Sequence, residues 1–460
     1  MNKPQLLPEE SRKNVSPAQC ESYCQTLKKM VDCQTVYRRD GSNDGEFQRF
    51  YQVIEESFPL ISQRAQRLCF GTGCFVYVIS GENPTKNIML MSHHDVVEGG
   101  EGWQTDPFAA TVQGDSLYGR GTIDTKTPLF SQLQACEELL AEGYSFPGMN
   151  VYIGSSNNEE VCGDGMVLAV SYFQKQGIHF DVVLDEGGAI TTGMIPGITG
   201  KSAMVAVHEK SRHMFRCTTS RNLQGHGGLN PSKDNAIVRM SQFIQAVEKA
   251  RIYKSSFAPE VRATFEKHAP YMAFPYKLLF GHFGIFGPLL KQIMSRIPQA
   301  SAMLSTSISF TSIFGGSHED PQIQAKNVEA TMFLRCVREE DLYQGLEKIK
   351  AIAKDYQVEI EELYRDYCTP TSFTGKPYQI LEEVLRENFP DVMVAPFLLT
   401  AGTDARRFTD VADNILRFAP IDLDKAQYAS IHSANEHIKI ANIGQCVLFY
   451  KDVVKRLTGV

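Results

Sequence analysis

The chain has 460 residues, of which 43% are hydrophobic and 22% are charged. This length exceeds one ordinary hydrophobic core, so we expect about two globular domains. The formal net charge of −7 leaves no broad basic surface, which argues against nucleic acid as a partner. Neither an apolar secretion signal nor a run of about 18 uncharged apolar residues occurs, so we expect no membrane span and a cytoplasmic location.

The first half of the chain alternates apolar runs with helical periodicity. The runs at 87–92, 149–154, 180–184 and 203–207 have the length and composition of buried strands. Helical periodicity separates them at 127–142 and 165–176. The pattern predicts an α/β unit with a mixed, largely parallel sheet flanked by helices.

The pattern changes near residue 210. Half-buried strands are predicted in "HMFRCTTS", "AKNVEATMFLRCV" and "VEIEELYR", with helices at 233–249 and 338–355 between them. After residue 368 the first pattern resumes, with the strand "VMVAPFLLT" and a last helix near 438–457. We therefore expect one domain formed by residues 1–209 and 368–460, and an inserted α+β domain formed by residues 210–367.

Acidic and imidazole side chains follow several of the predicted strands. The strand in "NIMLMSHHDVVEGG" ends at His93, His94 and Asp95. The candidate set collected from the strand ends and nearby motifs is His93, Asp95, Asp124, Glu159, Glu160, Asp185, Glu186 and His432. Side chains at the carboxyl ends of neighbouring parallel strands meet at one edge of the sheet. Carboxylates gathered there would repel one another unless cations compensate them. Imidazole and carboxylate without thiolate favour zinc, with manganese or cobalt as replacements.

The eleven cysteines are scattered and odd in number, so they cannot all pair within one chain. Cys20 and Cys24 are one helical turn apart, a spacing that would suit a metal. No second cluster at zinc-ribbon spacing accompanies them, so we expect both to pack in the core.

Eight ordered motifs resemble one known family. They are "SHHDVV", "WQTDPF", "YGRGTIDTK", "NNEEVCGDG", "LDEGG", "GHGGLNP", "GTDAR" and "IHSANE". In order and spacing, over about residues 65–445, they resemble the dinuclear-zinc metallopeptidases that include aminoacylases, carboxypeptidase S, glutamate carboxypeptidase and succinyl-diaminopimelate desuccinylase. The last, fifth and seventh motifs resemble most the branch of carboxypeptidase S and the N-acyl amino acid hydrolases.

The resemblance implies two zinc ions and a role for each strand-end residue. His93, Asp124 and Glu186 would hold one zinc, and Asp124, Glu160 and His432 would hold the other. A hydroxide that bridges the metals would attack the amide carbonyl, and Glu159 would act as general base and then acid. The family also places a cis peptide after the bridging aspartate, which is the bond between Asp124 and Thr125 here.

Three neighbouring residues have less direct assignments. Asp95 is placed to accept the second N–H of His93 and to fix its tautomer. Because neighbours on a strand face opposite sides, only one of Asp185 and Glu186 should reach the metal, and we favour Glu186. By the same alternation, His94 should point away from the site.

The inserted domain carries further candidates. The resemblance implies that it serves as a lid and dimerisation domain, and that His226 reaches the active site of a second copy and stabilises the oxyanion. The candidate contacts for the substrate carboxylate are Arg335 in the insertion, and Arg406 and Gly402 in "GTDAR". Either arginine could instead form an ordinary ion pair.

One departure from the family pattern concerns the segment after Gly315 and Gly316. Family members usually have Asn there, whereas this chain has "SHEDPQIQAKN", with Asp320 or Gln322 at that place. This leaves two interpretations open, altered carboxylate recognition and a shifted loop. The aromatic segment 271–290 is too interrupted to span a membrane, and could line an acyl groove, contact a partner subunit or pack internally.

Taken with the resemblance, these patterns predict a dizinc hydrolase of an amide bond next to a free amino-acid carboxylate. Its substrate would be a small N-acyl amino acid or a peptide. The alternatives are a dipeptidase or amide hydrolase with altered carboxylate recognition, and a non-catalytic metal-binding homologue. The presence of every expected ligand favours an active enzyme.

Overall fold

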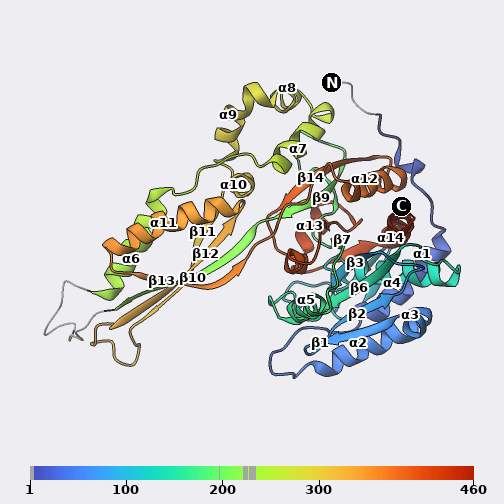
Figure 1. Cartoon of the computed structure of the whole chain (residues 1–460), viewed down its shortest axis with the longest axis horizontal. Helices are drawn as coiled ribbons and strands as arrows, with labels where there is room; N and C mark the ends of the chain where they lie inside the picture. The colour runs from blue at the N-terminus through green and yellow to red at the C-terminus, as the bar shows by residue number, and fades with distance from the viewer. Residues whose placement is uncertain (1–4, 196, 221–225, 227–234, 460) are drawn as a thin grey trace. The chain divides into compact units, whose positions relative to one another are not determined.

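The computed structural model describes residues 5–195, 197–220, 226 and 235–459 (Figure 1). The chain divides into two compact units. The first consists of Met1–His208, Ala263–His282 and Thr369–Val460, and the second of Glu209–Arg262 and Phe283–Cys368.

The first unit is built on a mixed sheet, which has ten strands among the described residues. At its centre, β6 (Met149–Ser156), β3 (Lys86–His93), β7 (Val182–Asp185) and β15 (Ile415–Arg417) run parallel to one another. Antiparallel pairs dominate toward both margins, which are formed by β1 (Gln66–Phe70), β2 (Cys74–Ile79), β9 (Lys201–Glu209), β8 (Ile190–Thr192), β16 (Asp422–Leu423) and β14 (Val392–Leu399). The parallel pairing expected of the sheet is therefore concentrated at its centre, with one further parallel pair, β8 with β16, at a margin.

The register of the central strands brings their carboxyl ends together. Strand β3 pairs with β6 up to the couple His93 and Ser156, and with β7 up to Leu90 and Leu184. Residues that directly follow these three strands therefore lie at one edge of the sheet.

Helices cover both faces of this sheet. One hydrophobic cluster joins strand residues such as Leu90 and Ile153 to α1 (Pro17–Val31), α2 (Asp44–Ser57), α3 (Pro59–Arg64), α4 (Lys126–Ala141), α12 (Lys376–Asn388) and α14 (Ile440–Thr458). A second cluster joins the alternate residues, such as Met89 and Tyr152, to α5 (Gly165–Gln176) and the 3-10 helix η3 (Asp404–Phe408). Because side chains alternate along a strand, apolar runs such as β3 are buried on both faces.

A small antiparallel sheet joins two distant parts of the first unit. Strand β5 (Ser116–Tyr118) pairs with β4 (Thr111–Gln113) on one side and with β17 (His437–Lys439) on the other. The chain just before α4 is therefore fixed to the chain between α13 (Lys425–Ser430) and α14.

The second unit is an α+β fold of its own. Its antiparallel sheet has the order β11 (Ser307–Gly315), β12 (Asn327–Cys336), β10 (Ser211–Ser220), β13 (Glu359–Asp366). Alternate residues of β12 pack on α6 (Ala236–Ala250) and α11 (Glu339–Asp355), which form one core with it. The helices α9 (Phe283–Met294) and α10 (Pro298–Leu304) precede β11.

The unit to which residues 263–282 belong differs from the prediction, which placed them in the inserted domain. This segment contains the end of α7 (Pro259–His268), the 3-10 helix η2 (Ala269–Tyr271) and α8 (Tyr276–Gly281), and it belongs to the first unit. Thr264 Oγ1 donates to the carbonyl of Pro396 at 2.6 Å, and His268 Nε2 lies 3.0 Å from Ser202 Oγ. These buried polar contacts attach the segment, so the aromatic segment 271–290 is divided between the units.

Two further expectations concern cysteines and membranes. Cys20 and Cys24 are buried and free on α1. Among the described residues, no helix combines the length and the apolar character needed to cross a bilayer. The cytoplasmic location stays a prediction.

Candidate metal centre

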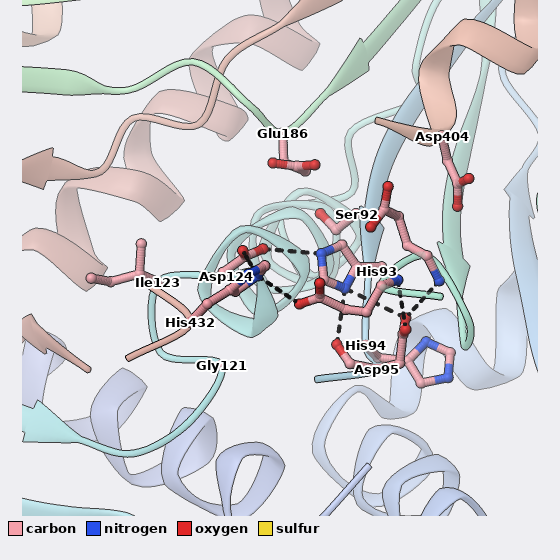
Figure 2. Close-up of polar contacts among 12 residues, drawn as sticks. Ser92, His93, His94, Asp95, Gly121, Ile123, Asp124, Glu186, Asp404 and His432 are labelled. Carbon is pink, nitrogen blue, oxygen red and sulfur yellow. Dashed lines mark hydrogen bonds and ion pairs between the residues drawn. The ribbon is translucent and has the colours of Figure 1, made fainter. Parts of the chain in front are cut away.

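Polar side chains from five places in the first unit converge at the edge where the parallel strands end. His93 ends β3, Glu159 and Glu160 follow β6, and Glu186 follows β7. Asp124 comes just before α4, and His432 lies between α13 and β17. Figure 2 shows Asp124 between the rings of His93 and His432, with Glu186 on another side of the same space.

Asp124 contacts both imidazoles with different oxygens. Its Oδ1 lies 3.0 Å from His93 Nε2, and its Oδ2 lies 3.0 Å from His432 Nε2. His432 Nε2 is also 3.1 Å from Glu160 Oε1, and ligand atoms of His93, Asp124 and Glu160 lie within 4.8 Å of one another. Two atoms that ligate one zinc ion at its usual bond lengths lie roughly 3 Å apart. The donor set therefore fits a bound metal ion beside Asp124.

The peptide bond between Asp124 and Thr125 is cis, as the resemblance predicts.

Asp95 is placed differently from the expectation. The hydrogen-bond partner of His93 Nδ1 is the backbone carbonyl oxygen of Asp95, at 2.9 Å, whereas the Asp95 carboxylate oxygen is 3.5 Å away. The carboxylate instead accepts the backbone N–H groups of Glu159 and Glu160, at 3.1 and 3.0 Å. Asp95 thus contacts the histidine mainly through its main chain, and its buried side chain holds the loop that carries both glutamates.

Asp185 and Glu186 have separate positions, as strand alternation predicts. Asp185 is buried and accepts the N–H groups of Glu186 and Ala405, at 2.9 and 2.8 Å. Glu186 lines the cavity at the metal centre. The next residue, Gly187, has a φ of +110°, a conformation that residues other than glycine rarely adopt.

His94 points away from this centre, into an aromatic cluster. Its ring stacks on Phe50 and Phe75, with centroids 5.0 and 5.3 Å away. Its Nδ1 lies 2.8 Å from Ser155 Oγ. Burial lowers the pKa of His94 well below its ordinary value, so the ring is neutral and structural.

A buried ion pair between Arg120 and Glu436 supports the centre, and the sequence analysis missed it. Arg120 Nη1 donates to Glu436 Oε2 at 2.6 Å, and both side chains are almost fully buried. Glu436 Oε1 also accepts the N–H groups of Gly121, Ile123 and Asp124, at 3.1, 2.7 and 3.1 Å. One carboxylate thereby fixes the loop that carries Asp124.

The same pair reaches the loop that carries His432. Arg120 Nη2 donates to the carbonyl of Ser433 at 3.0 Å. His432 itself has a φ of 57°, which is uncommon for a residue with a side chain and has to be stabilised by its surroundings. Arg120 and Glu436 lie in the motifs "YGRGTIDTK" and "IHSANE". Membership of these two motifs is the sequence feature that could have identified them as part of the site.

Asp404 is a second buried carboxylate that the sequence analysis did not single out. It accepts from Ser156 Oγ at 2.6 Å, and burial raises its pKa to about 6. Burial is the main cause of the raised pKa of Glu159, and the negative charge of Asp404 adds to it. It lies in "GTDAR", between the two residues of that motif selected as substrate contacts.

The protonation of these groups reflects the crowding of negative charge. Burial raises the pKa of Glu159 and Glu186 well above the ordinary value, and nearby carboxylates add to the effect on Glu186. Hydrogen bonds to Asp124 and Glu160 raise the pKa of His432 to about 10. Burial opposes ionisation of Asp124 as well, but its contacts with His432 and His93 outweigh burial and lower its pKa. Without positive charge beside them, these carboxylates cannot all stay ionised, and a bound cation supplies that charge.

The centre opens into a cavity of about 280 Å³. Gly402 and Tyr428 line it together with the candidate ligands. Arg406 is almost fully buried in η3 and donates to the carbonyl of Thr403, so its described contacts support the loop that carries Gly402.

The remaining candidates, His226 and Arg335, belong to the second unit. His226 Nε2 lies 2.8 Å from Gln322 Oε1, and the other residues of "GHGGLNP" lie outside the described residues. One of the two residues considered at the departure from the family pattern, Gln322, is therefore next to the candidate histidine. Arg335 lies on β12, with its guanidinium 5.6 Å from the ring centre of Phe333.

Comparisons with known proteins identify relatives that match most of the chain. The N-fatty-acyl-amino acid synthase/hydrolase of Danio rerio is 29% identical over 446 residues, which cover 95% of this chain and 86% of the relative. A probable carboxypeptidase S-like protein of Dictyostelium discoideum is 27% identical over 418 residues, covering 89% of this chain and 79% of the relative.

Among solved structures, the fold matches an M20 family metallo-carboxypeptidase from Sulfolobus solfataricus with a TM-score of 0.67 and 17% identity, over 95% of this chain and 99% of that one. Human carnosine dipeptidase 1 matches with a TM-score of 0.62 and 15% identity, over 96% and 98% of the two chains. Residues 89–456 also match the model of peptidase family M20/M25/M40. This chain therefore belongs to peptidase family M20/M25/M40 and is a metallohydrolase that acts on amide bonds.

Proposed function

We propose that the protein is a dizinc hydrolase that cleaves an amide bond next to a free amino-acid carboxylate. The observation that carries this proposal is the position of Asp124, whose two oxygens each face a different imidazole at 3.0 Å. A carboxylate between two nitrogen ligands, with further carboxylates around it, is the donor set that two adjacent zinc ions require.

The ligands divide into two sets around Asp124. His93 and Glu186 would complete one set, and His432 and Glu160 the other. Contacts of about 3 Å with Asp124 and Glu160 support the placement of the histidines, and the cavity lining supports that of Glu186. When bound, two zinc ions lower the pKa of a water between them and polarise the substrate carbonyl.

Glu159 is our candidate for proton transfer. It lines the same cavity as the ligands, and its backbone N–H is held by Asp95, so its position is fixed by a second element. In this role its carboxylate takes the proton of the attacking water and delivers it to the nitrogen of the departing amine.

The names of the relatives suggest two substrate classes for this chain, N-acyl amino acids and peptides. Both leave a free carboxylate beside the scissile bond. Gly402 at the cavity wall is our candidate for contact with this carboxylate through its backbone, with Arg406 supporting its loop and Arg335 as the candidate charge in the second unit. Gln322 beside His226 supplies an amide in place of the expected Asn, which favours retained carboxylate recognition.

Metal content and substrate preference test this proposal together. The purified protein should contain close to two zinc ions per chain, with manganese or cobalt able to replace them, and should hydrolyse N-acyl amino acids or dipeptides. A panel that pairs each free carboxylate with its amide identifies the role of that group, and comparing N-acyl amino acids with dipeptides identifies the class. Two metals without hydrolysis would indicate a non-catalytic homologue. Equal rates on acids and amides would indicate a different amide hydrolase.

We also propose that the protein is a homodimer assembled through the second unit. If His226 serves the active site of a second copy, the twofold arrangement would place each His226 beside the opposite metal centre. His226→Ala chains have their own metal centre, and Glu159→Ala chains have their own His226. After subunit exchange, a mixed dimer would contain one complete site, so activity should rise well above both parents. Demonstrated exchange without recovery would exclude this role.

A further inference from the structure

Helix α9 presents apolar side chains to solvent along one face. Ile285, Leu289 and Ile293 are 74%, 46% and 44% exposed. They are four residues apart, so they form one stripe along the helix. A different face, formed by Phe283, Leu290 and Met294, is buried. The helix therefore has one apolar face inside its unit and a second one outside.

The chain around α9 is free of negative charge. No Asp or Glu occurs between Glu266 and Glu319, although acidic residues outnumber basic ones in the protein as a whole. This interval contains Lys267, Lys277, Lys291 and Arg296. Arg296 follows Leu289 by seven residues and so continues the exposed stripe in the turn after the helix. Lys291 and Arg296 are both exposed.

A second exposed apolar residue comes from the same acid-free interval. Phe274, in the part of the interval that belongs to the first unit, is 82% exposed, more than any other large hydrophobic side chain in the described part of the chain. Exposed apolar side chains therefore occur outside α9 as well, within the same interval that lacks Asp and Glu.

We propose that α9 is an interfacial helix that binds a lipid surface rich in anionic headgroups. Ile285, Leu289 and Ile293 would enter the boundary between headgroups and acyl chains, while Arg296 contacts headgroup phosphates. An apolar stripe next to exposed cations, with no Asp or Glu in the same stretch of sequence, is the composition of helices that lie in a membrane surface. Interfaces between proteins are instead enriched in Tyr, Trp, Phe, Met and Arg, and the stripe has aliphatic residues at all three positions. This proposal does not depend on the proposed reaction, because binding is measured without turnover.

Vesicle flotation with the full-length protein tests the proposal. The wild-type chain should float with vesicles of phosphatidylcholine containing phosphatidylserine, and much less with phosphatidylcholine alone. Added salt should weaken the binding in part. The triple variant Ile285→Ser, Leu289→Ser, Ile293→Ser should bind roughly tenfold or more weakly, because it removes the inserted apolar area.

A matched control lies on the edge strand of the same unit. Ile313 and Phe314 on β11 are also exposed large hydrophobic residues, but they lie beyond α9 in another element. The double variant Ile313→Ser, Phe314→Ser should keep vesicle binding. Arg296→Glu should reduce binding to anionic vesicles even if the triple variant fails to fold, which circular dichroism would detect.

Several outcomes would overturn the proposal. They are failure of the wild-type protein to float, undiminished flotation of the folded triple variant, and loss of binding only in the β11 control. If light scattering shows that the triple variant converts a wild-type dimer into a monomer, and the wild-type protein does not bind vesicles, a second copy covers this face instead.

Discussion

Two regions of the molecule contrast in what they bury. The edge of the sheet at the metal centre buries charged side chains, whereas the exposed face of α9 leaves apolar side chains in solvent. At the metal centre, charged side chains are buried, and other segments of the chain satisfy them: Glu436 accepts three backbone N–H groups, and Asp95 accepts two. On α9, apolar side chains such as Ile285 are exposed. A buried charge has to be compensated by other groups of the chain, so its contacts within the structure indicate its role. An exposed apolar face has no such contacts, so its role depends on the surface that binds to it.

The largest effect should come from the charged region, at Glu159. We expect Glu159→Gln to lower kcat by roughly 10² to 10⁴, because proton transfer is lost, while the metal content is unchanged. Steady-state kinetics and metal analysis of the same preparation measure both quantities. His432→Ala is the comparison, since it removes a candidate ligand and should lose metal along with activity. Near-normal turnover of Glu159→Gln would contradict its assignment.

The support of the metal centre should be the next most sensitive feature. Glu436→Ala leaves Arg120 charged and buried, and we expect a loss of about 3–5 kcal/mol in the free energy of unfolding. Denaturant unfolding measures this loss, and titration with a zinc chelator measures metal affinity.

The double variant Arg120→Met, Glu436→Leu separates the two effects. It removes both charges and should recover much of the stability. Metal affinity should stay low, because the N–H groups of Gly121, Ile123 and Asp124 have lost their common acceptor. Recovery of metal affinity along with stability would show that the pair acts only on folding.

The attachment of residues 263–282 should depend on pH. His268 is fully buried, and burial lowers its pKa to about 4, against an ordinary value of about 6.5. Between these values the unfolded chain takes up a proton that the folded chain does not. The contribution of neutral His268 to the free energy of unfolding is therefore complete above about pH 6.5. It falls as the pH decreases toward 4, by about 3 kcal/mol in total. His268→Gln should flatten this part of the curve of unfolding free energy against pH, and an unchanged slope would contradict the assignment.

The smallest effect should come from the exposed face. Leu289 is 46% exposed and its neighbour Leu290 is 3% exposed. We expect Leu289→Ala to change the free energy of unfolding by less than about 0.5 kcal/mol, and Leu290→Ala to cost about 2–5 kcal/mol. Thermal or denaturant unfolding of the pair measures the difference. A large loss at Leu289 would mean that this face is covered within the protein.

Much of the metal centre could be anticipated because it follows from local rules. Parallel strands end at a common edge, so placing His93 and Glu186 at the ends of two predicted strands brought them together. Alternation along a strand also separated His94 and Asp185 from the cavity correctly, because that rule needs no tertiary information.

The features that could not be anticipated depend on contacts between distant segments. Arg120 and Glu436 are more than 300 residues apart, and their spacing contains no periodicity that would pair them. His93 Nδ1 contacts the backbone carbonyl of Asp95, whereas the Asp95 carboxylate accepts the N–H groups of Glu159 and Glu160. This division of contacts forms only when the two segments meet in the folded chain. The attachment of 263–282 rests on contacts with distant segments, such as Thr264 with Pro396 and Lys267 with Glu382. The sequence pattern shows only a change of composition near residue 210.

The pairing of β5 with β17 has a consequence for biosynthesis. Tyr118 is paired with His437, and the loop before α4 takes its acceptor from Glu436. While the ribosome is still making the second unit, β5 has β4 beside it but lacks β17, and the loop that carries Asp124 lacks the carboxylate of Glu436. The loop that carries Asp124 therefore gains these two contacts only after residues 432–439 have left the ribosome.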